Sequence, residues 1–146
     1  MTIHTIGFSK KPAKLFFSIL RANSIRQIVD IRENNTSQLA GFTKKEDLRF
    51  FLREILDASY IHIPELAPDK LIRTTYKTTK NWEQYTASYI KLIEDRNIIS
   101  QLKADNPFIE PFALLCSEPK PDKCHRRLAA EMIIERLFPN GEILHL

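Results

Sequence analysis

The fold prediction starts from the stretch Leu114-Leu115-Cys116-Ser117-Glu118-Pro119-Lys120-Pro121-Asp122-Lys123-Cys124-His125-Arg126-Arg127. Residues 111–115, which overlap the beginning of this stretch, form a short apolar run of the length expected for a buried strand. An amphipathic pattern then continues from Lys123 to Phe138, as in a helix that packs on a core. The stretch is therefore predicted to be the loop between a strand and a helix.

The start of that helix is the first candidate for a functional site. Asp122 stands where an N-cap is expected, with Pro121 before it. The free N–H groups of the following residues would then lie at the positive end of the helix dipole, which favours an anion or a thiolate. The same loop holds both cysteines of the chain and one of its four histidines.

Further strands and helices alternate along the chain. The apolar runs predict strands over 2–6, 25–32, 59–63, 111–115 and 142–146. The helical patterns predict helices over 12–22, 82–96 and 123–138, and a further helix that is capped by Thr43 and ends near Ile55. Residues 98–103 either extend the third helix or begin another. Such alternation predicts an α/β fold in a single domain over residues 1–146, a three-layer sandwich with a mainly parallel sheet of about five strands flanked by helices.

Composition and charge limit the class of protein. The formal charge is +4 and the basic excess lies before Asn81, with 14 basic and 8 acidic residues up to Lys80 and 8 and 10 after it. This suits an anionic partner such as a nucleotide or nucleic acid. No run of about 20 apolar residues and no signal-peptide pattern occurs. We therefore expect a cytoplasmic protein without a membrane partner, whose cysteines are reduced thiols.

Polar side chains follow several predicted strands. Ser9 comes after the first strand, Asp30 and Arg32 end the second, His62 and Glu65 follow the third, and Cys116 and Glu118 follow the fourth. The polar loop from Glu33 leads to Gly41-Phe42. In open parallel sheets ligands bind outside the carboxyl ends of the strands, so we predict that these residues gather at one edge.

Thiol chemistry is one interpretation of this edge. Cys124, in the first helical turn beside His125 and Arg126, would have a lowered pKa and act as nucleophile. Cys116 could then act as the resolving thiol that reacts with the modified Cys124. The alternative is that both cysteines simply pack in the core. Asp30, Glu65 and Glu118 are acid or base candidates, or they pair with Arg32 and Arg126.

Two other interpretations are a metal site and an anion site. Cys116, Cys124, His125 and His62 are suitable zinc ligands, but the cysteine spacing is not a standard one and neighbouring ligands diverge on a helix. We predict no metal and no cofactor. An anion could instead bind Arg32, Arg126 and free backbone N–H groups. The chain has only three glycines and no glycine-rich phosphate loop.

A basic segment from Asp69 to Lys80 has two interpretations. It contains Lys70, Arg73, Lys77 and Lys80 around Tyr76. The pattern suits a phosphate backbone, or it is a solvated mobile connection. The stripe of Trp82, Tyr85 and Tyr89 after it is typical of core packing more than of a base-stacking platform.

Several motifs resemble one known family, the domain-of-unknown-function family 488. They are Thr5-Ile6-Gly7-Phe8-Ser9, Val29-Asp30-Ile31-Arg32, Gly41-Phe42, residues 60–66 and, above all, Cys116-x-Glu118 followed by Cys124-His125-Arg126. Family members carry a histidine where this chain has Phe8. The resemblance implies a small α/β domain and the location of its site, and it implies no reaction.

The sequence therefore predicts a polar site at the carboxyl edge that binds a phosphate-bearing ligand, a nucleotide or nucleic acid, with thiol-assisted chemistry as an extension. The catalytic candidates are Cys124, Cys116, His125, Glu118, His62, Glu65 and Asp30, and the ligand-binding candidates are Arg32, Arg126, Ser9, Gly41 and Phe42. The alternatives are a non-enzymatic nucleic-acid-binding module with the Cys-His-Arg loop as scaffold, and a partner-recruiting domain. Whether the protein is an enzyme, and its oligomeric state, stay open.

Overall fold

The computed structural model describes residues 1–146 and contains five strands and six α-helices. The strands are β1 (Thr2–Gly7), β2 (Gln27–Asp30), β3 (Ser59–His62), β4 (Phe112–Cys116) and β5 (Glu142–His145). The α-helices are α1 (Ala13–Ala22), α2 (Lys45–Leu56), α3 (Lys70–Thr79), α4 (Trp82–Asp95), α5 (Ile98–Asp105) and α6 (His125–Leu137), with short 3-10 helices η1 (Gln38–Thr43) and η2 (Pro64–Leu66). None of the helices is both long and apolar enough to cross a membrane.

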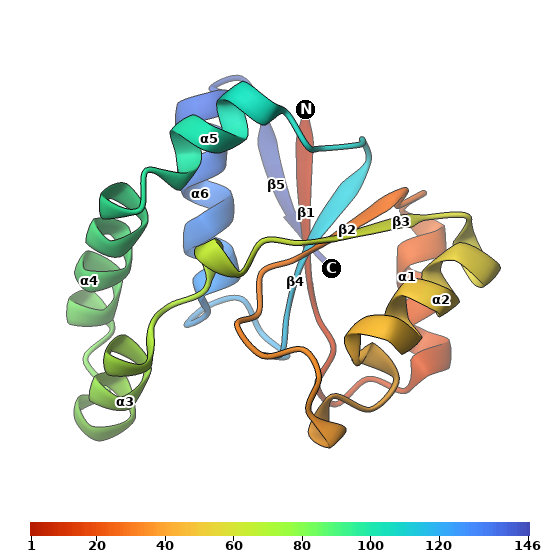
Figure 1. The fold of residues 1–146 in the computed structure, drawn as a ribbon, viewed down its shortest axis with the longest axis horizontal. Helices are drawn as coiled ribbons and strands as arrows, with labels where there is room; N and C mark the ends of the chain where they lie inside the picture. Colours follow the sequence, from red (N-terminus) through yellow and green to blue (C-terminus); the bar gives the residue numbers. More distant parts are fainter.

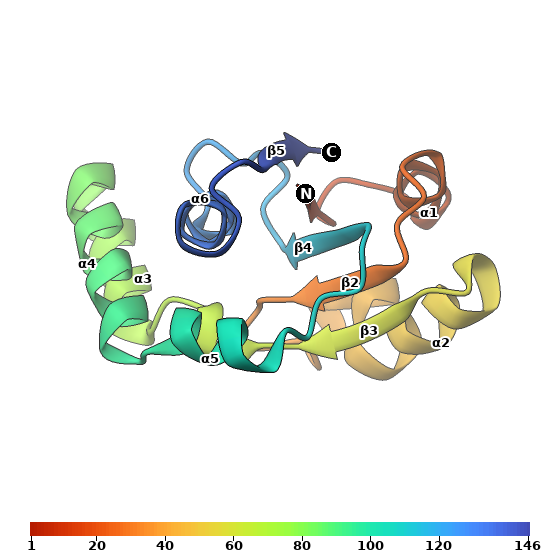
Figure 2. The same ribbon diagram turned by 90° about the horizontal axis from the view of Figure 1, so that it is seen from above.

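The strands form one sheet in the order β3-β2-β4-β1-β5, and every neighbouring pair is parallel. Helices α1 and α2 cover one face, and α6 covers the other with α5, α4 and α3 beyond it (Figures 1 and 2). The predicted α/β sandwich with a parallel five-stranded sheet is confirmed.

The two helical layers follow from the direction in which the chain crosses the sheet. From β1 to β2 to β3 it moves toward one edge, and from β3 to β4 to β5 it moves back. Because crossovers between parallel strands are right-handed, a reversal of direction puts the later helices on the opposite face. Strand β4 lies between β2 and β1. The chain after β4 continues to α6 on one face of the sheet, whereas the chain after β1 and β2 continues to α1 and α2 on the opposite face. The carboxyl end of β4 is therefore a topological switch point, where such sheets bind ligands.

The core has two parts, one on each face of the sheet. Successive side chains of a strand point to opposite faces. Accordingly, Phe112 and Leu114 pack with the cluster that includes α4, α5 and α6, and Ala113 and Leu115 pack with the cluster of α1 and α2. This alternation directs the next residue of β4, Cys116, to the α6 face.

Two predicted helix caps are wrong. Helix α6 begins at His125 and its N-cap is Cys124, whose sulfur accepts a hydrogen bond from the Arg126 N–H at 3.4 Å, so Asp122 is not the cap. Thr43 does not cap α2 either, because its hydroxyl donates to the Ala40 carbonyl and accepts from a buried guanidinium. In both places the side chain that the sequence pattern indicates as N-cap does not cap the helix in the folded protein.

The basic segment after Asp69 is a helix and not a mobile connection. Asp69 caps α3 by accepting a hydrogen bond from the Ile72 N–H at 2.8 Å. The next aromatic residues behave as predicted for core packing, since Tyr85 and Tyr89 are buried. Helix α5 is separate from α4, because Asn97 between them has a left-handed backbone with φ of 54°.

Candidate functional site

The site is built where the loop after β4 crosses the end of β1. The two strands stay paired beyond their last residues, since the Ser9 N–H donates to the Ser117 carbonyl at 3.0 Å. Gly7 permits this approach: a Cβ there would lie 1.7 Å from the Glu118 carbonyl oxygen and 2.6 Å from Nη1 of Arg126. Only a residue without a side chain fits at this point of β1.

The two cysteines meet at this crossing. Cys116 ends β4 and Cys124 caps α6, and their sulfur atoms are 2.9 Å apart with both residues buried. They are free thiols. The Sγ of Cys124 also accepts the Arg126 N–H at 3.4 Å, and either sulfur can donate the hydrogen bond that joins the two cysteines.

Arg126 lies against the same sulfur. It is fully buried, its Nη1 donates to Cys116 Sγ at 3.1 Å and to the Glu118 carbonyl, and its Nε donates to Thr5 Oγ1 at 3.3 Å. Its Nη2 has no hydrogen-bond partner. Arg126, which the sequence predicts to bind an anion, therefore contacts the thiol pair from inside the protein.

The thiols differ in acidity. Burial would raise the pKa of Cys116, but the hydrogen bond from Cys124 and the charge of Arg126 outweigh burial and lower it. The hydrogen bond to Cys116, together with burial, raises the pKa of Cys124. These directions favour Cys116 as the more acidic thiol, whereas the sequence pattern predicts the lowered pKa at Cys124.

Asp30 and Arg32 form a second buried cluster on the α2 face. The guanidinium donates two hydrogen bonds of 2.8 Å to the Asp30 carboxylate and two more to Thr43, and the Tyr60 hydroxyl donates to Asp30 at 2.6 Å. Asn35 completes the cluster. Burial would raise the pKa of Asp30, but these contacts outweigh burial and hold it below its usual range. Asp30 is thus engaged in an internal ion pair and does not line the hollow described below.

The two predicted histidines contact the backbone between these clusters. His62 Nε2 lies 2.6 Å from the Arg32 carbonyl oxygen, and His125 Nε2 lies 3.1 Å from the Ile31 carbonyl oxygen. Burial lowers the pKa of His125 to about 4, so its ring is neutral near pH 7. Nowhere do three or more His, Cys, Asp or Glu side chains gather so that they could hold a metal ion.

Other predicted residues do not reach the thiol pair. Gly41 and Phe42 lie in η1, where the Phe42 ring packs on Phe16 and Phe17. Glu65 is exposed on η2 and does not line the hollow.

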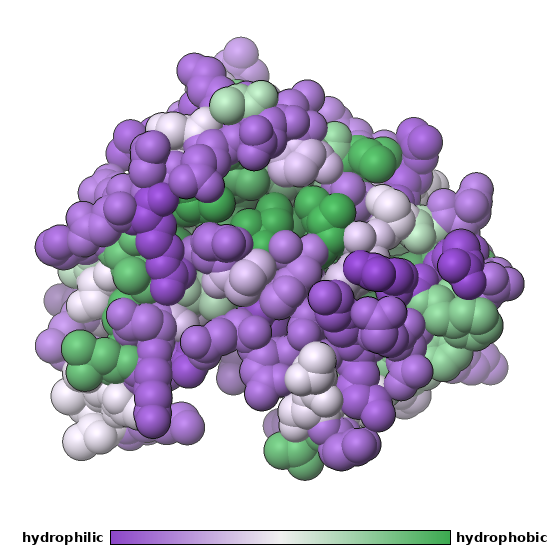
Figure 3. Space-filling model, viewed as in Figure 1, coloured by the Kyte–Doolittle hydropathy of each residue, from purple (hydrophilic) through white to green (hydrophobic).

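A hollow of about 660 Å³ opens above the cysteines. It is visible in Figure 3 as the indentation between α3 and the loop after β2, with hydrophilic residues around it. Its lining combines Cys116, Ser117, Glu118, Lys123, Cys124 and His125 with Arg32, Glu33 and Asn34, with Arg73, Tyr76 and Lys77 of α3, and with Lys80 directly after that helix. Cys124 and Arg32 therefore share one site, and four residues of the predicted basic segment, three of them basic, join them.

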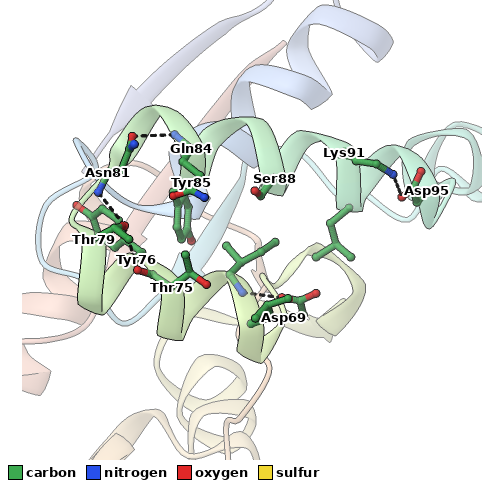
Figure 4. Close-up of a pocket in the computed structure, with 13 residues that line it drawn as sticks. Asp69, Thr75, Tyr76, Thr79, Asn81, Gln84, Tyr85, Ser88, Lys91 and Asp95 are labelled. Atoms are coloured by element: carbon green, nitrogen blue, oxygen red, sulfur yellow. Dashed lines mark hydrogen bonds and ion pairs between the residues drawn. The ribbon is translucent and has the colours of Figure 1, made fainter.

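A second hollow, of about 350 Å³, lies between α3 and α4 (Figure 4). Several of its polar groups are engaged within the helices: Asp69 and Asn81 cap α3 and α4, and Lys91 pairs with Asp95 at 2.6 Å. It contains no thiol, histidine or arginine. The hollow above the cysteines is the better candidate site.

Sequence reasoning missed several residues of this site. The motif around Gly7 does not single out this glycine, and the helical pattern places Lys123 within a helix. The signal for Gly7 is a lone glycine at a strand end, where a close backbone approach is expected. No sequence signal shows that α3 lies opposite the loop after β4.

The fold and site define a class of protein: a parallel α/β domain with a buried Cys–Cys–Arg cluster at the switch point of its sheet. The family model described as Domain of unknown function DUF488 matches residues 12–133, and the chain belongs to this family. The match runs from Pro12, just before α1, to Ile133 in α6, and it confirms the family that the motifs resemble. None of the curated proteins and none of the solved structures matches the chain.

Proposed function

We propose that the hollow binds a phosphate-bearing ligand, a nucleotide or a segment of nucleic acid, directly above the thiol pair. One observation carries the proposal. Lys77, Lys80 and Lys123 line the hollow and have no carboxylate within ion-pair distance. Three unpaired cations around one concave surface favour a ligand with several negative charges.

The other charged groups of the lining support the same conclusion. Arg32 is neutralised by Asp30, and Arg73 by Glu33. The Glu118 carboxylate is the remaining acid of the lining and is exposed. The net charge left in the hollow is therefore positive.

The ring of Tyr76 offers a second contact. Tyr76 is half-buried in the lining, and the Lys80 ammonium lies 5.6 Å from its ring centroid. A partly exposed aromatic ring beside a cation can stack on a nucleobase while the cation contacts a phosphate. This favours a nucleotide over inorganic phosphate.

The test uses lysines of α3 and the lysine directly after it. Adenosine triphosphate and short single-stranded RNA and DNA are titrated against wild type, the double variant Lys77→Gln/Lys80→Gln, and Lys70→Gln at several salt concentrations. Lys70 lies on α3 but not in the hollow, so it is the matched control. We expect the double variant to weaken binding and to reduce the slope of log K against log salt by about two for nucleic acid, with Lys70→Gln unchanged. Equal effects of the two variants, or no binding, would contradict the proposal.

The alternative is a non-enzymatic module whose basic first half binds nucleic acid, with the Cys-His-Arg loop as scaffold. The two differ in whether the ligand covers the thiols. A ligand above the cysteines slows alkylation of Cys116 at saturation, whereas a ligand held on the outer side of α3 leaves that rate unchanged. The alkylation rate with and without saturating ligand distinguishes them.

A further inference from the structure

The positive charge of Arg126 needs a counter-charge. The residue is fully buried, and no carboxylate lies within ion-pair distance of it. A buried guanidinium without an anion carries a large desolvation cost. Its side chain contacts the Thr5 hydroxyl, the Glu118 carbonyl and Cys116 Sγ, and only the sulfur can carry a negative charge.

We infer that Cys116 is a thiolate paired with Arg126, and that Cys116 and Cys124 form a redox-active dithiol that reduces small hydroperoxides. Cys116 is the nucleophile and Cys124 the resolving thiol. This inference does not depend on the phosphate-binding proposal, because it requires only the contacts around the two sulfur atoms.

The contacts give each sulfur a distinct role. Cys116 Sγ accepts a hydrogen bond from Arg126 Nη1, and Cys124 Sγ accepts the Arg126 N–H. With Cys116 ionised, the hydrogen between the two sulfur atoms, which are 2.9 Å apart, lies on Cys124, so Cys124 is the donor of that pair. The other titratable groups that act on Cys116 or respond to it are Lys11, from the loop after β1, and Tyr85 of α4. The Lys11 ammonium adds positive charge on the β1 side, which also favours the thiolate.

The chemistry balances in two steps. The Cys116 thiolate attacks one oxygen of the hydroperoxide, the O–O bond breaks, and the other oxygen leaves with a proton as water or an alcohol, which yields a sulfenic acid. The Cys124 thiol then attacks that sulfur, the S–O bond breaks and water leaves, which yields the Cys116–Cys124 disulfide. A small dithiol reductant restores both thiols by exchange.

The surroundings restrict the oxidant and set the reducibility of the disulfide. Both cysteines line the hollow but expose no more than 2% of their surface, which keeps out a protein disulfide and restricts the oxidant to a small molecule such as a hydroperoxide. Oxidation removes the thiolate and leaves Arg126 without a counter-charge. The reduced state is therefore favoured, and the disulfide is an oxidising one.

The experiment treats the folded protein with one equivalent of hydrogen peroxide near neutral pH and measures intact mass, with a sulfenic-acid trapping reagent in parallel. We expect wild type to lose the mass of two hydrogen atoms. Cys124→Ser should gain one oxygen atom that is trapped on Cys116, and Cys116→Ser should react at least about tenfold more slowly than wild type. Circular dichroism confirms that each variant is folded.

Other outcomes overturn the inference. Trapping of a sulfenic acid on Cys124 in Cys116→Ser at the wild-type rate would make Cys124 the nucleophile. A disulfide that forms only in denaturant, or only between two chains, would show that the pair is structural. Neither result would bear on ligand binding by the lysines of α3, so the two proposals fail separately.

Discussion

Gly7 and Arg126 show at the level of single residues how the site depends on close packing. The loop after β4 passes so near β1 that no Cβ fits at position 7, and the guanidinium of Arg126 fills the space beside it. The position of the Cys116 sulfur therefore depends on a residue that performs no chemistry.

A Gly7→Ala substitution tests this dependence. The added methyl would overlap the Glu118 carbonyl oxygen, which is backbone and can move only with its loop. We expect a loss of at least about 2 kcal/mol in the free energy of unfolding, measured by urea denaturation, and a changed alkylation rate of Cys116.

Gly41→Ala is the comparison. It has space around it but a φ of +56°, so it should lose stability for backbone reasons and leave the alkylation rate of Cys116 unchanged. If Gly7→Ala proved as stable as wild type with the same thiol reactivity, the close approach would have no consequence for the site.

Helix α6 shows at the level of an element how one residue serves structure and chemistry together. Its N-cap is a cysteine, where serine, threonine, aspartate or asparagine is usual. The cap contact fixes the Cys124 sulfur next to Cys116 while it satisfies a free N–H of the first turn.

Replacing the cap separates these two roles. Serine can accept the same hydrogen bond from the Arg126 N–H, whereas alanine cannot, so we expect Cys124→Ala to be about 1 kcal/mol less stable than Cys124→Ser in urea denaturation. Equal stability of the two variants would show that the sulfur contact contributes nothing to the helix.

At the scale of the whole molecule, the environment of His125 makes the free energy of unfolding depend on pH. Burial lowers the pKa of His125 to about 4, below the value of about 6.5 for an exposed histidine. Between these two values the unfolded chain binds a proton at this residue that the folded chain does not. Stability therefore falls as the pH drops through this window and rises as the pH increases.

His125→Gln should flatten this dependence, because glutamine does not titrate and its amide can still reach the Ile31 carbonyl. The measurement is the free energy of unfolding from urea denaturation at a series of pH values between about 7 and about 4. The pKa of His145 is lowered as well, so a residual slope of the same sign is expected, and His145→Gln is the matched control. A slope in His125→Gln equal to that of wild type would contradict the buried neutral ring.

The positions of the strands and most helices could be predicted because the spacing of apolar residues along the chain determines which secondary structure buries them on one side. The run ending at Leu115 and the pattern before Phe138 each carry enough apolar surface to fix their own element. The caps at Asp122 and Thr43 were wrong because such signals contribute only about 1 kcal/mol, which a tertiary contact outweighs.

The sequence by itself determined the parallel α/β fold, the family and the loop that holds both cysteines, since these depend on local periodicity and on a motif. Only the tertiary structure shows that Arg126, from the next helix, lies against Cys116, and the hydrogen bond and charge of Arg126 lower the pKa of this thiol. It also decided that Asp30 pairs inside the α2 face and that α3 adds its lysines to the hollow. Electrostatic interactions depend on distance in space, and distance along the chain does not reveal it.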